Sequence, residues 1–241
     1  MENKKIIAPD IYKSAILISI SCLGIVLFAN LTSPFVSDSF YLKVPLINKL
    51  AFDLPQYAGR FLSSFLFLGL MPLISAFALK FKAGQIGIAK PLIVKKKLFW
   101  IFLISSSVIL GALSSLDKGV NSFYPYSKAF PELILKYGWA MIFIHPISYF
   151  LFYYLPWEIL FRGVLIFPFI DSGKLSPIIF MQVIPSAMLH FGHPFSETLS
   201  AIVFGTFAAI LAVKTRSIIP GLIFHAVLGI SLDLTLIISN L

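Results

Sequence analysis

The sequence predicts an all-α protein, a polytopic transmembrane bundle of about seven helices with the functional cavity inside the bundle. Hydrophobic residues make up 59% of the 241 residues, charged residues only 12%, and the mean hydropathy is +0.94. This composition lies outside the range of soluble domains. Crossing a bilayer takes about 20 apolar residues, so the chain has room for roughly six to eight spans. Residues 1–241 are therefore predicted to form a single membrane domain.

Apolar runs that are long enough to cross a bilayer define the expected helices. The first run is expected to be a retained span, because it is long for a signal peptide and no small-residue cleavage site follows it. Residues 133–146 are apolar but end at Pro146. We expect them to form an interfacial or partly inserted helix that leads into the fourth span. The seven expected spans cover residues 13–33, 58–79, 98–115, 147–168, 176–192, 197–213 and 217–238.

The net charge of +9 comes largely from lysines in the connections between apolar runs. Basic connections alternate with less basic ones, which predicts a cytoplasmic N-terminus and an external C-terminus. Anionic lipid headgroups account for this charge, and nucleic acid is not an expected partner. The single cysteine, Cys22, excludes a disulfide framework and a cysteine zinc site. The basic residues expected on the cytoplasmic side are Lys4, Lys5, Lys13, Lys80, Lys82, Lys90, Lys95, Lys96, Lys97, Lys174, Lys214 and Arg216.

Ionisable residues inside the expected spans are the first candidates for a functional site, because a charge at bilayer depth is costly unless it is paired or lines a polar cavity. Glu158 and Arg162 lie four residues apart in the fourth span, on one face of a helix, where they can neutralise each other. This spacing suits a structural ion pair or a catalytic carboxylate held in its ionised form. We expect Pro156 to kink this helix and Gly163 to let a neighbouring helix approach closely.

Three histidines and an aspartate follow in the C-terminal third of the chain. His190 lies near the end of the fifth span, where a lone histidine is more often a hydrogen-bonded residue than a catalyst. His193 precedes Pro194 in a loop that is expected to be hydrated, and it is a weak candidate. His225 lies near the middle of the last span and needs a partner there. Asp233 is about 12 Å further along the helix, too far to be that partner, and is expected to face another polar group.

One carboxylate and two imidazoles from three spans can perform two kinds of chemistry. Glu158, His190 and His225 can bind zinc with water in the open position. Without a metal, the carboxylate can act as a general base on water while the histidines hold an oxyanion. Both arrangements lead to hydrolysis. The paired-histidine signature of soluble zinc proteases is absent, so we expect no required cofactor and keep zinc as the alternative.

Three motifs in order along the chain resemble those of the CAAX protease and bacteriocin-processing (CPBP) family, intramembrane endopeptidases related to the Ras-converting CAAX endopeptidase. The motifs are WEILFRG at 157–163, SAMLH at 186–190 and HAVLG at 225–229. The resemblance covers roughly residues 120–238, which we expect to form a CAAX-protease-like core. The family pattern is Glu-Glu-x-x-x-Arg, Phe-x-x-x-His and His-x-x-x-Asn. The first glutamate, usually regarded as the water-activating one, the phenylalanine and the asparagine are replaced here by Trp157, Ser186 and Gly229.

The resemblance implies an intramembrane endopeptidase of a bacterial plasma membrane that hydrolyses a peptide bond in a membrane-associated peptide or protein. Glu158 is then expected to deprotonate water and Arg162 to hold Glu158. His190 and His225 are expected to bind the oxyanion, with Trp157, Gly229 and Asp233 as secondary candidates. The replaced positions also fit a catalytically inactive member that acts as a bacteriocin-immunity or peptide-binding protein. A transporter with a proton relay is a further alternative, but it predicts an inverted repeat that the sequence does not show.

Overall fold

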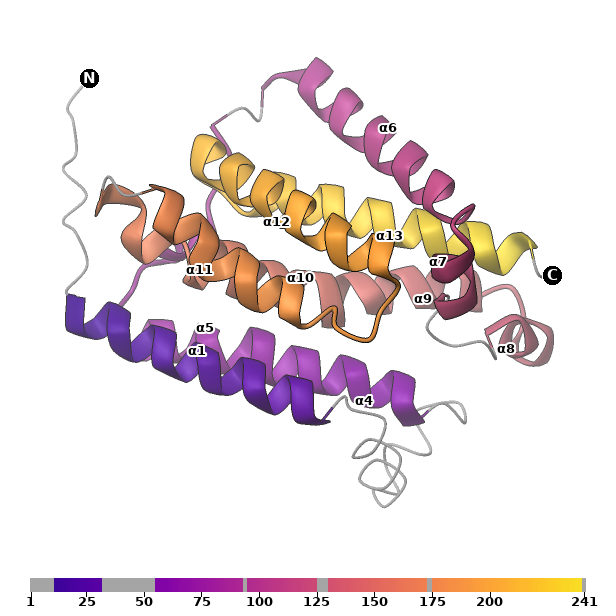
Figure 1. The fold of residues 1–241 in the computed structure, drawn as a ribbon, viewed down its shortest axis with the longest axis horizontal. Coiled ribbons are helices and arrows are strands. Elements are labelled where there is room, and N and C mark those ends of the chain that lie inside the picture. The colour runs from indigo at the N-terminus through magenta and orange to yellow at the C-terminus, as the bar shows by residue number, and fades with distance from the viewer. Residues whose placement is uncertain (1–10, 32–54, 93–94, 125–129, 173–174, 240–241) are drawn as a thin grey trace.

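The computed structural model describes residues 11–31, 55–92, 95–124, 130–172 and 175–239, and within these ranges the chain is a bundle of helices without strands (Figure 1). Six helical segments are long and apolar enough to cross a membrane. The protein is therefore an integral membrane protein with an all-α fold, as its composition predicts. The six segments are α1 (Ile11–Leu31), Gly59–Ala78, α6 (Lys97–Ser114), Met141–Asp171, α12 (Phe195–Thr215) and α13 (Ile219–Ser239).

The seventh expected span, 176–192, is a shorter helix in the structure. This helix, α11 (Leu175–Met188), has 14 residues. Its length corresponds to about 21 Å, less than the hydrocarbon core of a bilayer, which is about 30 Å thick. The chain turns after Met188 and passes Gly192 with a φ of +91°. The predicted helix is confirmed, whereas the predicted count of seven full spans is not.

The fourth span is longer than expected and forms the centre of the bundle. It consists of α9 (Met141–Tyr149), the π-helix η3 (Phe150–Tyr154), α10 (Leu155–Glu158), the π-helix η4 (Ile159–Val164) and the 3₁₀-helix η5 (Phe167–Ser172). In its most apolar stretch 78% of the residues are buried, against 17% in α6. Wide π-turns are often found at functional sites. Here two of them flank the four residues of α10 that include Pro156 and Glu158.

The expectation that Pro146 ends a separate helix over 133–146 is wrong. The short helix α8 (Phe130–Tyr137) ends before Gly138, which has a φ of +88°, and α9 then runs through Pro146. A proline inside a helix removes one backbone hydrogen bond. The helix persists because it is held by packing: Met141, His145 and Tyr149 are buried at four-residue steps along one face.

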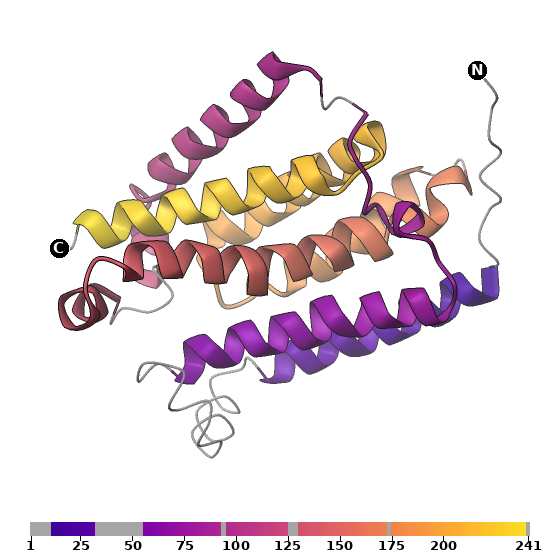
Figure 2. The same cartoon turned by 180° about the vertical axis from the view of Figure 1, so that it is seen from behind.

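The other helices surround the central span on two sides. One side is formed by α1 together with α4 (Pro55–Ser63), the π-helix η1 (Ser64–Leu70) and α5 (Met71–Ala78), which run side by side in both views (Figures 1 and 2). The other side is formed by the pair α11 and α12 and by α13, with α6 packed on α13. Helix α6 approaches α13 closely at Gly111, where a Cβ atom would overlap the Leu228 carbonyl.

Gly163 permits a close approach, as expected, but the neighbour is not a spanning helix. It is the 3₁₀-helix η2 (Ala83–Ile86) in the lysine-rich connection after α5. A Cβ atom at position 163 would lie 2.7 Å from the Ile86 carbonyl oxygen. The connection is therefore held against the central span, at the end of the bundle where α5 ends and α13 begins.

Candidate functional site: two histidine–carboxylate pairs around Trp157

Glu158, Arg162 and His225 meet between the central span and α13. The Glu158 carboxylate is completely buried and Arg162 is 1% exposed. Glu158 Oε1 lies 3.2 Å from Arg162 Nη1 and 2.8 Å from His225 Nδ1. Both sequence expectations are confirmed, because Glu158 pairs with Arg162 on one helix face and His225 finds a partner at bilayer depth.

Glycines on the facing helices make room for this buried pair. A Cβ atom at Gly221 of α13 would lie 3.3 Å from Glu158 Oε2, and one at Gly205 of α12 would lie 3.9 Å from Arg162 Nη2. The guanidinium carbon of Arg162 lies 5.3 Å from the centroid of the Phe204 ring, a cation–π contact. Glu158 Oε2 has no hydrogen-bond partner among the described residues. The carboxylate therefore makes its polar contacts through one oxygen.

A second histidine–carboxylate pair lies at the turn between α11 and α12. His190 Nδ1 faces the Ser186 carbonyl oxygen at 2.8 Å, and because a carbonyl only accepts, the ring carries its proton on Nδ1. Its Nε2 lies 3.9 Å from Glu197 Oε1. That oxygen also accepts hydrogen bonds from the Tyr124 hydroxyl at 2.7 Å and from His193 Nδ1 at 2.9 Å.

The sequence does not single out Glu197 or Tyr124, and it makes His193 only a weak candidate. Glu197 lies in the first turn of α12, where an acidic residue is common for purely local reasons. The available signal was its spacing, four residues after His193. Tyr124 ends a separate short helix, α7 (Lys118–Phe123), and nothing in the sequence connects it to the turn.

Trp157 fills the space between the two pairs. Its indole is 2% exposed and meets the His190 ring edge-on at 5.6 Å and the His225 ring edge-on at 6.4 Å between centroids. The residue at this position is thus part of the same cluster as both histidines. Gly229, the other replaced position in the motifs, lies one turn after His225, and a Cβ atom there would overlap the hydroxyl of Tyr154.

Asp233 lies apart from this cluster. Its Oδ2 is 3.2 Å from Nε2 of His145 in the central span, and the side chains are 2% and 1% exposed. The expectation that Asp233 faces another polar group is confirmed. The partner is a histidine that the sequence analysis did not single out.

The proposed zinc ligands do not form a metal centre. No three His, Cys, Asp or Glu side chains among the described residues are grouped so that they could hold a metal ion. Glu158 contacts His225. His190 is separated from this pair by the Trp157 ring and faces Glu197 instead. The zinc alternative therefore has no cluster of three ligands among the described residues.

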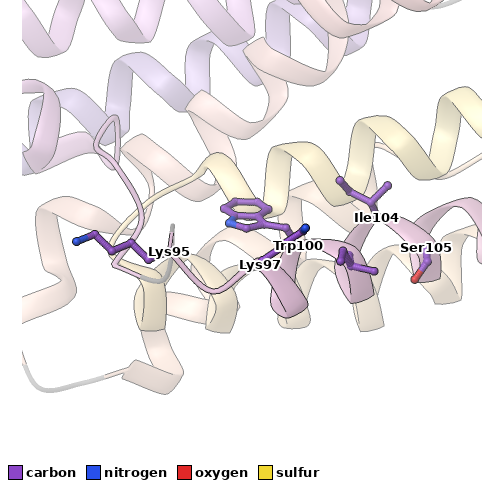
Figure 3. A pocket seen from close by; sticks show the side chains of 6 residues that line it. Lys95, Lys97, Trp100, Ile104 and Ser105 are labelled. Atoms are coloured by element: carbon purple, nitrogen blue, oxygen red, sulfur yellow. The ribbon is translucent and has the colours of Figure 1, made fainter.

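An open pocket of about 540 Å³ lies at the start of α6 (Figure 3), and no histidine lines it. It is apolar with lysines at its rim, as expected of a surface near lipid headgroups. It shares no residue with either histidine–carboxylate pair. The lining residues are Lys95, Lys97, Trp100, Ile101, Ile104 and Ser105.

The position of His190 makes stability depend on pH. Burial lowers the pKa of His190 from 6.5 to about 4. Between these values the unfolded chain binds more protons than the folded one, so stability falls as the pH drops from 6.5 towards 4, by about 3 kcal/mol in total. We expect the melting temperature of the purified protein to fall over this range, and to fall less in His190→Gln. Parallel pH curves for the two proteins would contradict the prediction.

The part of the chain that contains the site matches a known protein family. Residues 138–230 match the family model described as type II CAAX prenyl endopeptidase, Rce1-like. The match starts just before α9 and ends inside α13, so both histidine–carboxylate pairs and Trp157 lie within it. Comparisons with curated proteins and with solved structures found no match.

Proposed function

Since residues 138–230 match the family model of the Rce1-like type II CAAX prenyl endopeptidases, we propose that the chain is an intramembrane endopeptidase. Its substrate would be a membrane-associated peptide or protein, and the reaction hydrolysis of a peptide bond without a required cofactor. The observation that carries this proposal is the contact between Glu158 Oε1 and His225 Nδ1 at 2.8 Å inside the matched segment. A carboxylate beside an imidazole in a water-poor site is an acid–base device.

The burial of the pair suggests how the roles are divided. Glu158 is completely buried, whereas 18% of the His225 side chain is exposed. The imidazole, rather than the carboxylate, can therefore meet a substrate. In our proposal Arg162 holds Glu158, Glu158 orients His225 through Nδ1, and His225 Nε2 takes a proton from the attacking water. The carboxylate stabilises the imidazolium that this step creates. His190 lines the other side of Trp157 and contacts the substrate.

The test compares new protein N- and C-termini in membranes of cells that express the wild-type chain or Glu158→Gln. Termini that vanish in Glu158→Gln would support a Glu158-dependent protease and identify its targets. His225→Gln is the second variant, because it removes the imidazole and leaves the Glu158–Arg162 pair intact. Both variants must be present at wild-type levels, and a chelator in the assay is expected to leave the termini unchanged.

A non-catalytic role is the second candidate, and one observation favours it. The buried Trp157 indole contacts both histidine rings and fills the space between them. A member of the family that binds a peptide, for example in bacteriocin immunity, would need no water there. Identical profiles of termini in wild type, Glu158→Gln and His225→Gln at equal protein levels would support this candidate.

We also propose that the lysine-rich end of the bundle faces the cytoplasm of a bacterial cell. Helices α1, α6 and α13 begin at this end, and α5 and α12 finish there (Figure 1). Lysine and arginine near span ends favour the cytoplasmic side. In a Cys22→Ala background, a cysteine placed at the exposed Lys90 should react with an impermeant maleimide only after the membrane is opened. Labelling in intact cells would reverse the orientation.

A further inference from the structure

The central span and α13 contact each other at two levels that are one helical turn apart on both helices. Glu158 and His225 form the first level of contact, at 2.8 Å. Tyr154 lies four residues before Glu158, and Gly229 lies four residues after His225. Tyr154 and Gly229 form the next level, because a Cβ atom at position 229 would overlap the tyrosine hydroxyl. The space that a side chain at 229 would occupy is therefore taken by a phenolic O–H.

The surroundings of this hydroxyl leave it available as a donor. Tyr154 is 5% exposed, and its ring meets the His225 ring at 4.9 Å between centroids. No described residue forms a hydrogen bond with the Tyr154 hydroxyl. The neighbouring Tyr153 is different, since its hydroxyl accepts a hydrogen bond from Arg60 Nη2 at 2.7 Å. Tyrosine hydroxyls inside proteins usually have a partner, so a donor left beside a catalytic histidine suggests a partner on the substrate.

We propose that Tyr154 is a further catalytic residue, whose O–H donates a hydrogen bond to the carbonyl oxygen of the peptide bond that is cut. This inference rests on the proposed endopeptidase function. The Tyr154 and His225 rings are in contact, with 4.9 Å between their centroids, so a carbonyl oxygen that reaches His225 would also lie near the Tyr154 hydroxyl. A donor aimed at the developing oxyanion is one of the largest contributions that a single group makes to such reactions.

The proposed reaction needs only a water molecule, His225 as the proton carrier and the Tyr154 hydroxyl as the hydrogen-bond donor. The water oxygen bonds to the carbonyl carbon, one water proton passes to His225 Nε2, and the negative charge that develops on the carbonyl oxygen is stabilised by the Tyr154 O–H. When the C–N bond breaks, His225 returns the proton to the leaving nitrogen. The products are a carboxylic acid and an amine.

The experiment uses Tyr154→Phe, which removes the hydroxyl and keeps the ring. Its matched control is Tyr153→Phe, which removes the adjacent hydroxyl that Arg60 uses. Both variants, wild type and Glu158→Gln are first compared by the termini that depend on Glu158. The full-length proteins are then purified, and kcat and KM are measured with a synthetic peptide that spans the most abundant of these termini.

We expect Tyr154→Phe to lower kcat about 100-fold or more, with KM within threefold of wild type and an unchanged melting temperature. Tyr153→Phe should keep kcat within threefold. A Tyr154→Phe protein with near-wild-type kcat would overturn the inference while leaving the endopeptidase in place. An equal loss in both variants would also overturn it, because it would show a general effect of losing a hydroxyl. If no termini depend on Glu158 in the first comparison, it is the proposed function that fails. If Tyr154→Phe accumulates poorly, kcat is calculated per folded molecule, and this value is compared with that of wild type.

Discussion

Replacing Arg162 by methionine is expected to destabilise the protein by roughly 3–5 kcal/mol, because it leaves the Glu158 carboxylate buried without its cation. The carboxylate is completely buried and lies 3.2 Å from Arg162 Nη1. After the substitution His225 is the one hydrogen-bonding partner that the carboxylate keeps among the described residues, through the same oxygen. The quantity to measure is the free energy of unfolding of the purified protein in mixed micelles, together with its melting temperature.

The control for this prediction is the double variant Glu158→Gln/Arg162→Met. It removes both charges, so no buried charge is left without a partner, and it should recover most of the lost stability. A single Arg162→Met variant as stable as wild type would show that the pair is hydrated or that Glu158 is protonated. Neither state agrees with a carboxylate that orients His225. The same measurement therefore tests the premise of the mechanism without a substrate.

Replacing Gly229 by alanine is expected to be the second large perturbation. The added Cβ atom would overlap the Tyr154 hydroxyl, and inserting a carbon into a packed site costs typically about 1–3 kcal/mol. The hydroxyl belongs to a buried ring that contacts His225 and cannot simply swing away. Unfolding of Gly229→Ala should therefore occur at lower denaturant concentration and lower temperature than unfolding of wild type.

A double-mutant cycle tests whether overlap with the Tyr154 hydroxyl causes the loss of stability in Gly229→Ala. In the Tyr154→Phe background the hydroxyl oxygen, which is the nearest overlapping atom, is absent, and the ring carbon Cζ at 2.7 Å from the added Cβ atom remains too close. Gly229→Ala should therefore cost at least about 1 kcal/mol less there than in wild type. Gly84→Ala is the matched control, because a Cβ atom at Gly84 would meet no atom within 4 Å. Equal costs of Gly229→Ala in both backgrounds would mean that the tyrosine hydroxyl does not occupy this space. The catalytic role of Tyr154 would then lose its geometric basis.

Much of the fold could be predicted from hydropathy, because a bilayer constrains span length and composition strongly. The expected spans 13–33, 58–79 and 217–238 agree within about two residues with the helical segments at Ile11–Leu31, Gly59–Ala78 and Ile219–Ser239. The failures have physical causes. Pro146 suggests a helix end by its local chemistry, but packing of one helix face overrides it. α11 is apolar along its length yet too short to cross, which hydropathy alone does not separate from a full span.

The sequence was sufficient to predict a helical membrane protein whose costly intramembrane or near-membrane groups are Glu158, Arg162, His190 and His225. The motifs on separate spans also resemble those of the family whose model matches residues 138–230. Those conclusions depend on composition, spacing and local helix geometry, which the chain order contains. Which of these groups contact one another depends on the tertiary structure. His225 lies against Glu158, Asp233 against His145, and Glu197 beside both His190 and His193. The partners of His225 and His145 come from helices far apart in sequence, and side-chain directions across a helix interface depend on packing that no local pattern specifies.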